Sequence, residues 1–151
     1  MKKTFFLILV IFFYTFSAFG NPNGKGLICK CIKCILENDI LYKSYDLDMK
    51  ELIVYFDNGA ASAWTFKRVN DEILRGGLVP VEYKANISKI TWLWFELDRE
   101  TLTLKTVYPN SNIRKCTLFS NKDKLDSAAY DLFLKYQNQL NSKLKKNKIN
   151  Y

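Results

Sequence analysis

The chain has 151 residues, carries 23 lysine and arginine residues against 15 aspartate and glutamate residues, and contains no histidine. The absence of histidine excludes serine or cysteine nucleophiles that imidazole activates, as well as zinc or haem sites with histidine ligands. After Asp131 there are lysines and no acidic residue. The surplus of positive charge therefore gathers in a terminal segment, whereas a nucleic-acid-binding face would run through the body of the domain, and we expect no nucleic-acid partner.

Residues 1–20 are predicted to be a signal peptide. Two lysines open the chain, an apolar stretch follows over residues 5–16, and Ala18 and Gly20 are small residues at the positions that a signal peptidase inspects. The mature protein would then begin near Asn21 and would be exported to the periplasm or the extracellular space, with no stable membrane span after cleavage.

Two alternatives for this first segment are an uncleaved membrane anchor and a lipoprotein. The apolar stretch is shorter than the roughly 20 residues that a membrane-spanning helix needs. A lipid attached to Cys29 would require a smaller residue than Ile28 before it. After cleavage, residues 21–151 are long enough to bury the core of a single β-rich domain.

The first half of the mature chain alternates short runs of branched and aromatic residues with turn signals, which is typical of antiparallel strands. The clearest hairpin joins residues 51–56 to residues 60–66, because the Asn58-Gly59 pair tolerates the positive backbone dihedral angles of a tight turn. Other strands are expected over residues 26–33 and 79–84.

The most apolar strand of the mature chain is predicted over residues 90–97, with its two tryptophans on one face. Residues 98–100 are predicted to reverse the chain, so that residues 101–107 return beside this strand. A last strand, over residues 113–119, contains the fourth cysteine.

An amphipathic helix is predicted over residues 122–145, because apolar residues there recur at intervals of three and four. Ser120 and Asp123 are predicted to cap its start. The elements together predict a mainly β (α+β) fold. It consists of an antiparallel sheet of about six to eight strands, strongly curved or closed into a small barrel, with the helix packed on it or across one opening. The apolar stripe of the helix contains Leu125, Ala128, Ala129, Leu132, Tyr136, Leu140 and Leu144.

The four cysteines, Cys29, Cys31, Cys34 and Cys116, favour disulfides in an exported protein. One disulfide is expected to join the first strand, through Cys29 or Cys31, to Cys116 in the last strand. The sequence leaves the pairing open, because four cysteines allow three connectivities.

Two other interpretations of the cysteines are a redox-active Cys31–Cys34 pair and a four-thiolate zinc or iron–sulfur site. The pair lacks the helix N-terminus that activates the first cysteine of such motifs. Oxidation would compete with metal capture outside the cytoplasm. We therefore expect no metal and no cofactor.

Three aromatic side chains, Trp64, Trp92 and Trp94, are candidate ligand-binding residues, since they would suit the lining of an apolar pocket. The alternative interpretation places them in the core or against the covering helix.

Three acidic residues, Glu96, Asp98 and Glu100, alternate across a hairpin tip. Paired carboxylates can perform acid and base chemistry, but carboxylates at a turn are usually solvated, and Asp98 suits the role of a side-chain acceptor within the turn. No catalytic residue is therefore predicted. Asn86-Ile87-Ser88 fits a glycosylation acceptor, which has no meaning in a bacterial exported protein.

Two motifs support a resemblance to other proteins. These are Ile90-Thr91-Trp92 and the run Leu97-Asp98-Arg99-Glu100-Thr101-Leu102-Thr103-Leu104, with a cysteine near residue 29 and another at residue 116. In these features the chain resembles a loose class of uncharacterised small exported β-rich proteins with an early cysteine, an I-x-W strand, an L-D-R-x-T-L-x-L hairpin and a late cysteine. The resemblance implies a fold and no activity. The outline is also similar to that of small barrel inhibitors of lysozyme, but those lack a long C-terminal helix.

The function expected from the sequence is that of an exported, non-enzymatic binding protein whose ligand the sequence does not identify. A small apolar ligand and an envelope protein are the two candidate partners. The first alternative is an inhibitor or accessory protein that binds a macromolecule or an enzyme of the cell envelope. The second is a thiol–disulfide redox protein that uses Cys31 and Cys34.

Overall fold

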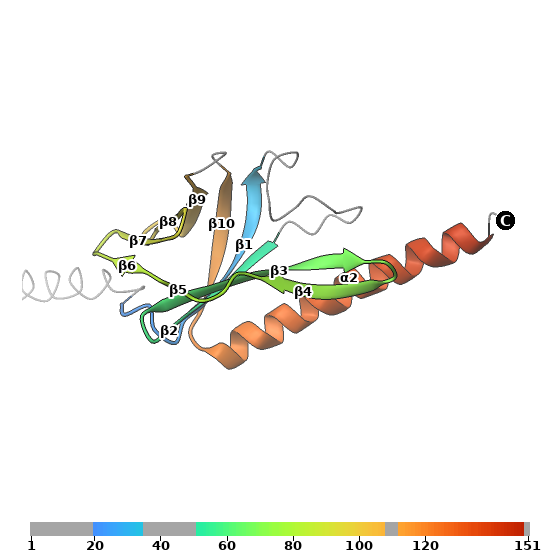
Figure 1. Ribbon diagram of the computed structural model, residues 1–151, viewed down its shortest axis with the longest axis horizontal. Coiled ribbons are helices and arrows are strands. Elements are labelled where there is room, and N and C mark those ends of the chain that lie inside the picture. The colour runs from blue at the N-terminus through green and yellow to red at the C-terminus, as the bar shows by residue number, and fades with distance from the viewer. Residues whose placement is uncertain (1–19, 35–50, 108–111, 150–151) are drawn as a thin grey trace, which may run out of the picture.

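The structure is a computed structural model that describes residues 20–34, 51–107 and 112–149 (Figure 1). The predicted signal peptide lies outside the described residues, apart from Gly20. The elements in chain order are β1 (Gly26–Lys33), β2 (Glu51–Asp57), β3 (Ala60–Val69), β4 (Glu72–Gly77), β5 (Val81–Glu82), β6 (Lys84–Ala85), β7 (Lys89–Trp92), β8 (Phe95–Asp98), β9 (Thr103–Thr106), β10 (Ile113–Phe119) and α2 (Lys122–Ile149).

The described strands form one antiparallel sheet in the order β4-β3-β2-β1-β10-β9-β8-β7-β6, and β5 pairs with β3 outside this row. The first and the last strand, β1 and β10, are neighbours in the middle of the sheet (Figure 1). The short segment 81–85 pairs with β3 through β5 and with β7 through β6. The sheet is therefore strongly curled, and this segment connects its two sides. The predicted curved antiparallel sheet with one C-terminal helix is confirmed, with more strands than expected.

The concave side of the sheet encloses the larger of two hydrophobic cores. Strands contribute to it from both halves of the sheet, because alternate residues of each strand point inward. The fully or almost fully buried members are Leu27, Cys29, Leu52, Val54, Phe56, Ala61, Ala63, Ile90, Trp92, Phe95, Leu97, Leu104 and Cys116.

The second core lies on the other side of the sheet, beneath α2 (Figure 1). The predicted stripe of the helix is confirmed, since Leu125, Ala129, Tyr136 and Leu140 are buried against the strands. Leu125 occupies the space that a Cβ atom at Gly26 would need, so glycine at this position lets the helix approach β1 closely. The strand residues of this core are Ile28, Ile53, Trp64, Phe66 and Ile73.

The helix starts at the predicted residue and extends beyond the predicted end at residue 145. Its cap differs from the prediction, because the side chain of Asn121 accepts a hydrogen bond from the backbone N–H of Lys124 at 3.0 Å. Asparagine satisfies an otherwise unpaired N–H of the first turn, so the predicted pair of Ser120 and Asp123 was wrong. In residues 20–34, 51–107 and 112–149, we find no helical segment that combines the length and the apolarity of a membrane span.

The Asn-Gly hairpin is confirmed, while the predicted strand over residues 90–97 was wrong. Asn58 and Gly59 have φ values of 49° and 78°, as the turn between β2 and β3 requires. Residues 90–97 instead form a hairpin of their own, because β7 and β8 pair with each other through Trp92 opposite Phe95. The chain reverses at Leu93, whose φ is 50°.

All four cysteines are oxidised, in the pairs Cys29–Cys116 and Cys31–Cys34. Cys29 and Cys116 lie directly opposite each other on β1 and β10, and their side chains are 0% and 5% exposed. This bridge joins residues 87 positions apart. On the chain-entropy model, closing so long a loop stabilises the folded state by about 4.5 kcal/mol. Of the two partners that the sequence left open for Cys116, the structure selects Cys29.

Candidate functional site

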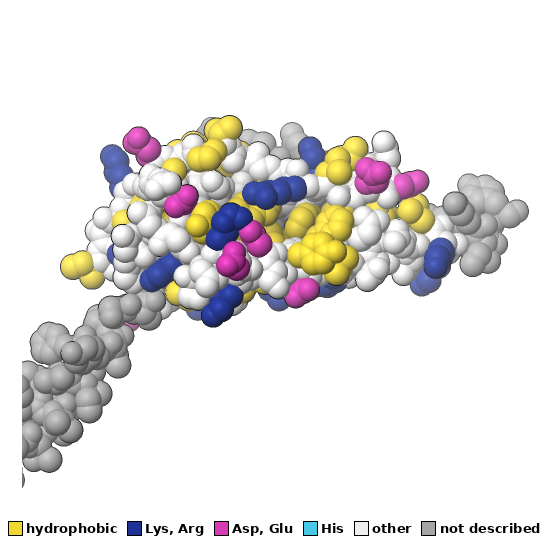
Figure 2. Space-filling model, turned by 90° about the horizontal axis from the view of Figure 1, so that it is seen from below, with side chains coloured by type: hydrophobic (Ala, Val, Ile, Leu, Met, Phe, Trp, Pro, Cys, Tyr) yellow, Lys and Arg dark blue, Asp and Glu magenta, His cyan; other side chains and the backbone are white. Residues whose placement is uncertain are grey.

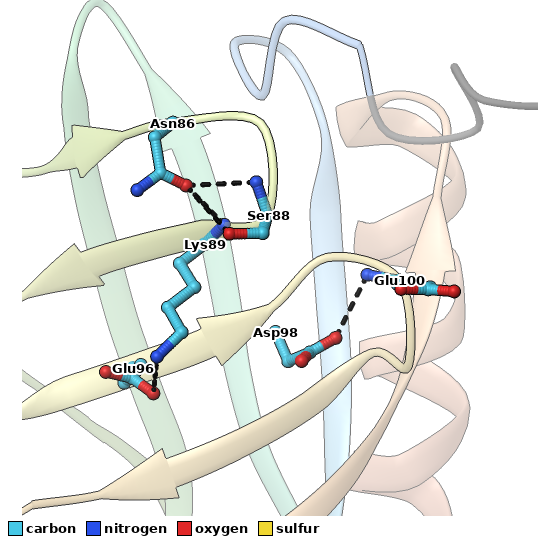
Figure 3. Close-up of polar contacts among 6 residues, drawn as sticks. All are labelled: Asn86, Ser88, Lys89, Glu96, Asp98 and Glu100. Atoms are coloured by element: carbon cyan, nitrogen blue, oxygen red, sulfur yellow. Dashed lines mark hydrogen bonds and ion pairs between the residues drawn. The ribbon is translucent and has the colours of Figure 1, made fainter.

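Two of the three acidic side chains of the hairpin, Glu96 and Asp98, make polar contacts with neighbouring groups (Figure 3). The carboxylate of Asp98 accepts hydrogen bonds from the backbone N–H of Thr101 at 2.7 Å and from that of Glu100 at 3.1 Å. The hydrogen bond from Thr101 is the main reason why the pKa of Asp98 is lowered. Asp98 thus remains a carboxylate that holds the turn between β8 and β9.

Glu96 forms an ion pair with Lys89 on the neighbouring strand, with 2.9 Å between Oε1 and Nζ (Figure 3). The hydrogen bond to Glu96 raises the pKa of Lys89. In the adjoining turn, Asn86 Oδ1 accepts hydrogen bonds from the backbone N–H groups of Ser88 and Lys89. These exposed polar groups are thus engaged in turn and cross-strand contacts, which is the arrangement of a solvated hairpin end.

The sulfur atoms that a thiolate metal site would need are joined to one another in the two disulfides. Within residues 20–34, 51–107 and 112–149, no group of three or more cysteine, aspartate or glutamate side chains is arranged to hold a metal ion. The described cysteines therefore serve as cross-links in this structure.

The three tryptophans do not converge on one site. Trp64 lies on the helix side of the sheet, where the guanidinium of Arg75 sits 3.9 Å from the centroid of its ring. Trp92 lies inside the curled sheet, and Trp94 follows it in the β7–β8 turn, packed at the margin of the inner core. The ligand-binding role of these residues stays a prediction. Trp92 and Trp94 lie at the same core, since the rings of both are near that of Phe95.

The interior beside Trp92 is filled by aromatic rings. The ring centroid of Trp92 is 5.3 Å from that of Phe95, in a stacked arrangement, and 5.5 Å from that of Phe56, edge to face. The ring centroid of Tyr83 is 5.4 Å from that of Phe56, also edge to face. The indole N–H of Trp92 is buried and has no hydrogen-bond acceptor among the residues that the structure describes. A small bound molecule that offers a hydrogen-bond acceptor could satisfy this N–H.

The β7–β8 turn presents apolar side chains to solvent. Leu93 is 52% exposed, and Val107, at the end of β9, is 66% exposed. The two lie at the same end of the sheet, because the backbone N–H of Val107 donates to the carbonyl oxygen of Trp94 at 2.8 Å. We call Leu93, Trp94 and Val107 the turn patch. It combines exposed apolar area with a leucine in the left-handed backbone region, where glycine or asparagine would be less strained.

A second apolar area lies on the helix side of the molecule, where Figure 2 shows hydrophobic side chains in the middle of the face. Tyr130 is an exposed large apolar residue of α2. Its ring stacks on Phe133 with centroids 6.1 Å apart, and Phe133 in turn contacts Phe66 of β3 at 6.0 Å. These rings are supported by the core beneath the helix, and no backbone strain accompanies their exposure, since α2 contains no residue with positive φ.

The sequence did not predict the turn patch. A turn is usually marked by glycine, proline or asparagine, and residues 90–97 contain none of these. The one available signal is that apolar residues fill every position from Trp92 to Phe95, which breaks the alternation that a half-buried strand requires.

No family model, no curated protein and no solved structure matches this chain. The candidate site therefore depends on the geometry described above.

Proposed function

We propose that this protein is an exported, non-enzymatic binding protein that docks onto another macromolecule of the cell envelope, as inhibitors and accessory proteins do. The observation that carries the proposal is Leu93, an apolar side chain that is half exposed on a backbone with φ of 50°. Asparagine or glycine would be better solvated and less strained at this position. Features that are unfavourable for the isolated fold tend to mark functional positions.

Packing inside the sheet supports a macromolecular partner over a small apolar ligand. The rings of Phe56 and Phe95 occupy the space beside Trp92, one of the predicted ligand-binding tryptophans. The turn patch, in contrast, is already at the surface, and exposed apolar side chains that gather in one place are a common feature of protein interaction sites.

Export is supported by the covalent chemistry and by the first segment of the chain. Both disulfides are of a kind that persists in oxidising compartments such as the periplasm or the extracellular space. Residues 1–20 have the composition of a signal peptide. A binding protein of the cell envelope would meet its partner in that compartment.

The proposal is tested by placing the photo-crosslinking residue p-benzoylphenylalanine at position 93 or, as a control, at position 87 in the producing cells. Ile87 is also an exposed large apolar residue, and it lies in the turn between β6 and β7, at the other end of these strands. We expect a covalent adduct of one discrete mass from position 93 and none from position 87. Equal adducts from both positions, or none from position 93, would contradict the proposal.

The matched substitution is Leu93→Asn, since asparagine tolerates positive φ and removes the apolar side chain. We expect the affinity for the cross-linked partner to fall at least about tenfold, as for an apolar residue central to an interface, with circular dichroism unchanged. Ile87→Asn should leave the affinity within error of the original protein.

Binding of a small molecule is the second candidate, and the buried indole N–H of Trp92 is the observation that favours it. Such a ligand would offer one hydrogen-bond acceptor to this N–H. Native mass spectrometry of the protein from its producing cells would show a small added mass that Trp92→Phe abolishes.

A further inference from the structure

The two disulfides of β1 differ in burial and in the length of chain that they close. Cys29–Cys116 is buried and joins residues 87 positions apart, whereas Cys31–Cys34 is partly exposed at the end of β1 and joins residues three positions apart. Closing a loop of three residues restricts the unfolded chain far less than closing the long loop does. Opening Cys31–Cys34 would therefore leave the fold cross-linked through its central strands.

The surroundings of the two sulfur atoms in this short bridge are unequal. Cys31 lies directly opposite Arg114 in the pairing of β1 with β10, so the two side chains share a face. Arg114 is 0% exposed, and its Nη1 donates a hydrogen bond to Thr106 Oγ1 at 2.9 Å, which fixes a positive charge inside this end of the sheet. A neighbouring cation favours the thiolate form of cysteine.

Cys34 has the opposite kind of neighbour. Its Sγ lies 4.0 Å from the carbonyl oxygen of Ile113. The negative end of a carbonyl dipole disfavours a thiolate and can accept the proton of a thiol. The two sulfur atoms of the bridge therefore have neighbours of opposite polarity, a cation on the face of Cys31 and a carbonyl oxygen beside Cys34.

We propose that Cys31–Cys34 is a thiol–disulfide exchange site that accepts two electrons from an external dithiol. The inference goes beyond docking and does not depend on it. The site lies at the same end of the sheet as the turn patch. Ile113, beside Cys34, pairs with Lys105 of β9, and Thr106, which follows Lys105, pairs with Phe95 at the start of β8.

The exchange proceeds in two steps. One thiolate of the dithiol, having released its proton to solvent, attacks Cys34 Sγ. A mixed disulfide forms, the Cys31–Cys34 bond breaks, and Cys31 leaves as a thiolate on the face that it shares with Arg114. The second thiol of the dithiol then attacks the other sulfur of the same dithiol, which is bonded to Cys34 in the mixed disulfide. The bond to Cys34 Sγ breaks, and Cys34 leaves and takes up the proton of the attacking thiol. The dithiol is oxidised to a disulfide, and the protein holds one thiolate and one thiol.

The first test exposes the oxidised protein to dithiothreitol under native conditions, followed by iodoacetamide and peptide mass mapping. We expect Cys31 and Cys34 to be alkylated before Cys29 and Cys116, with one equivalent of oxidised dithiothreitol formed per chain and circular dichroism unchanged. The proposal is overturned if both disulfides open together, or if Cys31–Cys34 opens only when the fold is lost.

The second test separates an exchange site from a bridge that is merely accessible. At pH 7, oxidised glutathione should form a mixed disulfide with Cys31 in Cys34→Ser at least about tenfold faster than with Cys34 in Cys31→Ser. Equal rates, or a faster reaction at Cys34, would overturn the assignment. In the Cys34→Ser background, Arg114→Lys should keep the rate and Arg114→Gln should lower it.

If the glutamine variant does not fold, the comparison of the two serine variants still decides. Leu93→Asn should leave all these rates unchanged. Failure of docking and failure of exchange are therefore observed separately.

Discussion

The two turns that flank β8 place a leucine in the same backbone conformation and in different surroundings. Leu93, before β8, has a φ of 50° and is half exposed, and Leu102, after β8, has a φ of 49° and packs against the inner core. Each turn is tied to a strand by a backbone hydrogen bond of 2.8 Å, from Val107 to Trp94 in the first and from Cys116 to Leu102 in the second.

The difference between the turns separates a structural leucine from a candidate functional one. A left-handed conformation costs a non-glycine residue roughly 1–2 kcal/mol. Burial of an apolar side chain contributes a stabilisation of similar size, about 1.5–3 kcal/mol when it is complete. Packing therefore offsets the cost of the left-handed backbone at Leu102. At Leu93 the exposed side chain offsets less of this cost, and apolar contacts with a partner would offset the rest.

The largest effect expected from this comparison is that of Leu102→Ala. The variant keeps the backbone strain and loses the packing, so the free energy of unfolding should fall by about 2 kcal/mol. Leu93→Ala should change it by no more than about 0.5 kcal/mol, as is usual for exposed positions. Urea denaturation of the two variants measures both values, and equal losses would remove the distinction between the turns.

Glycine substitutions should act in opposite directions at the two positions. Leu93→Gly relieves strain and should raise the free energy of unfolding by about 0.5–1 kcal/mol. Leu102→Gly relieves the same strain but loses core contacts, so it should lower the melting temperature. A lower melting temperature for Leu93→Gly would mean that the exposed leucine stabilises the isolated fold.

The smallest effect concerns the carboxylate that holds the second turn. The folded-state pKa of Asp98 lies below its ordinary value of 3.8, so its contribution to stability is present above that value and is lost as the pH falls through the folded-state pKa. Asp98→Asn should reduce stability by less than about 1 kcal/mol at pH 7, because the group is exposed. The difference between the original protein and the variant should disappear as the pH is lowered from 5 to 2 in thermal melts. If the stability difference between the two proteins stayed constant over this range, the loss in Asp98→Asn would come from hydrogen-bond geometry and not from the charge of the carboxylate.

Elements that depend on neighbouring residues could be predicted well from the sequence. The Asn58-Gly59 turn follows from the backbone freedom of these two residues, and both have the expected positive φ. The helix follows from the spacing of its apolar residues, and Leu125, Tyr136 and Leu140 are buried as that spacing requires.

Elements that depend on distant residues could not be predicted in the same way. The turn at Leu93 carries no local turn signal, and pairing of Phe95 with Thr106 of β9 keeps β8 in place in the sheet. Likewise, Trp64 and Trp92 have the same chemical character, and the strands that carry them direct one toward the helix and the other into the curled sheet.

Residue types and their spacing within a few positions are enough to predict the class of the fold, the positions of its clearest turn and its helix, and a set of cysteines suited to oxidation. The tertiary structure alone decided which cysteine joins Cys116, which face each tryptophan occupies and where Leu93 reverses the chain. These outcomes depend on how the strands pair and in which register, which for β1 and β10 involves residues far apart in the sequence. A shift of one residue in that register turns every side chain of a strand to the opposite face.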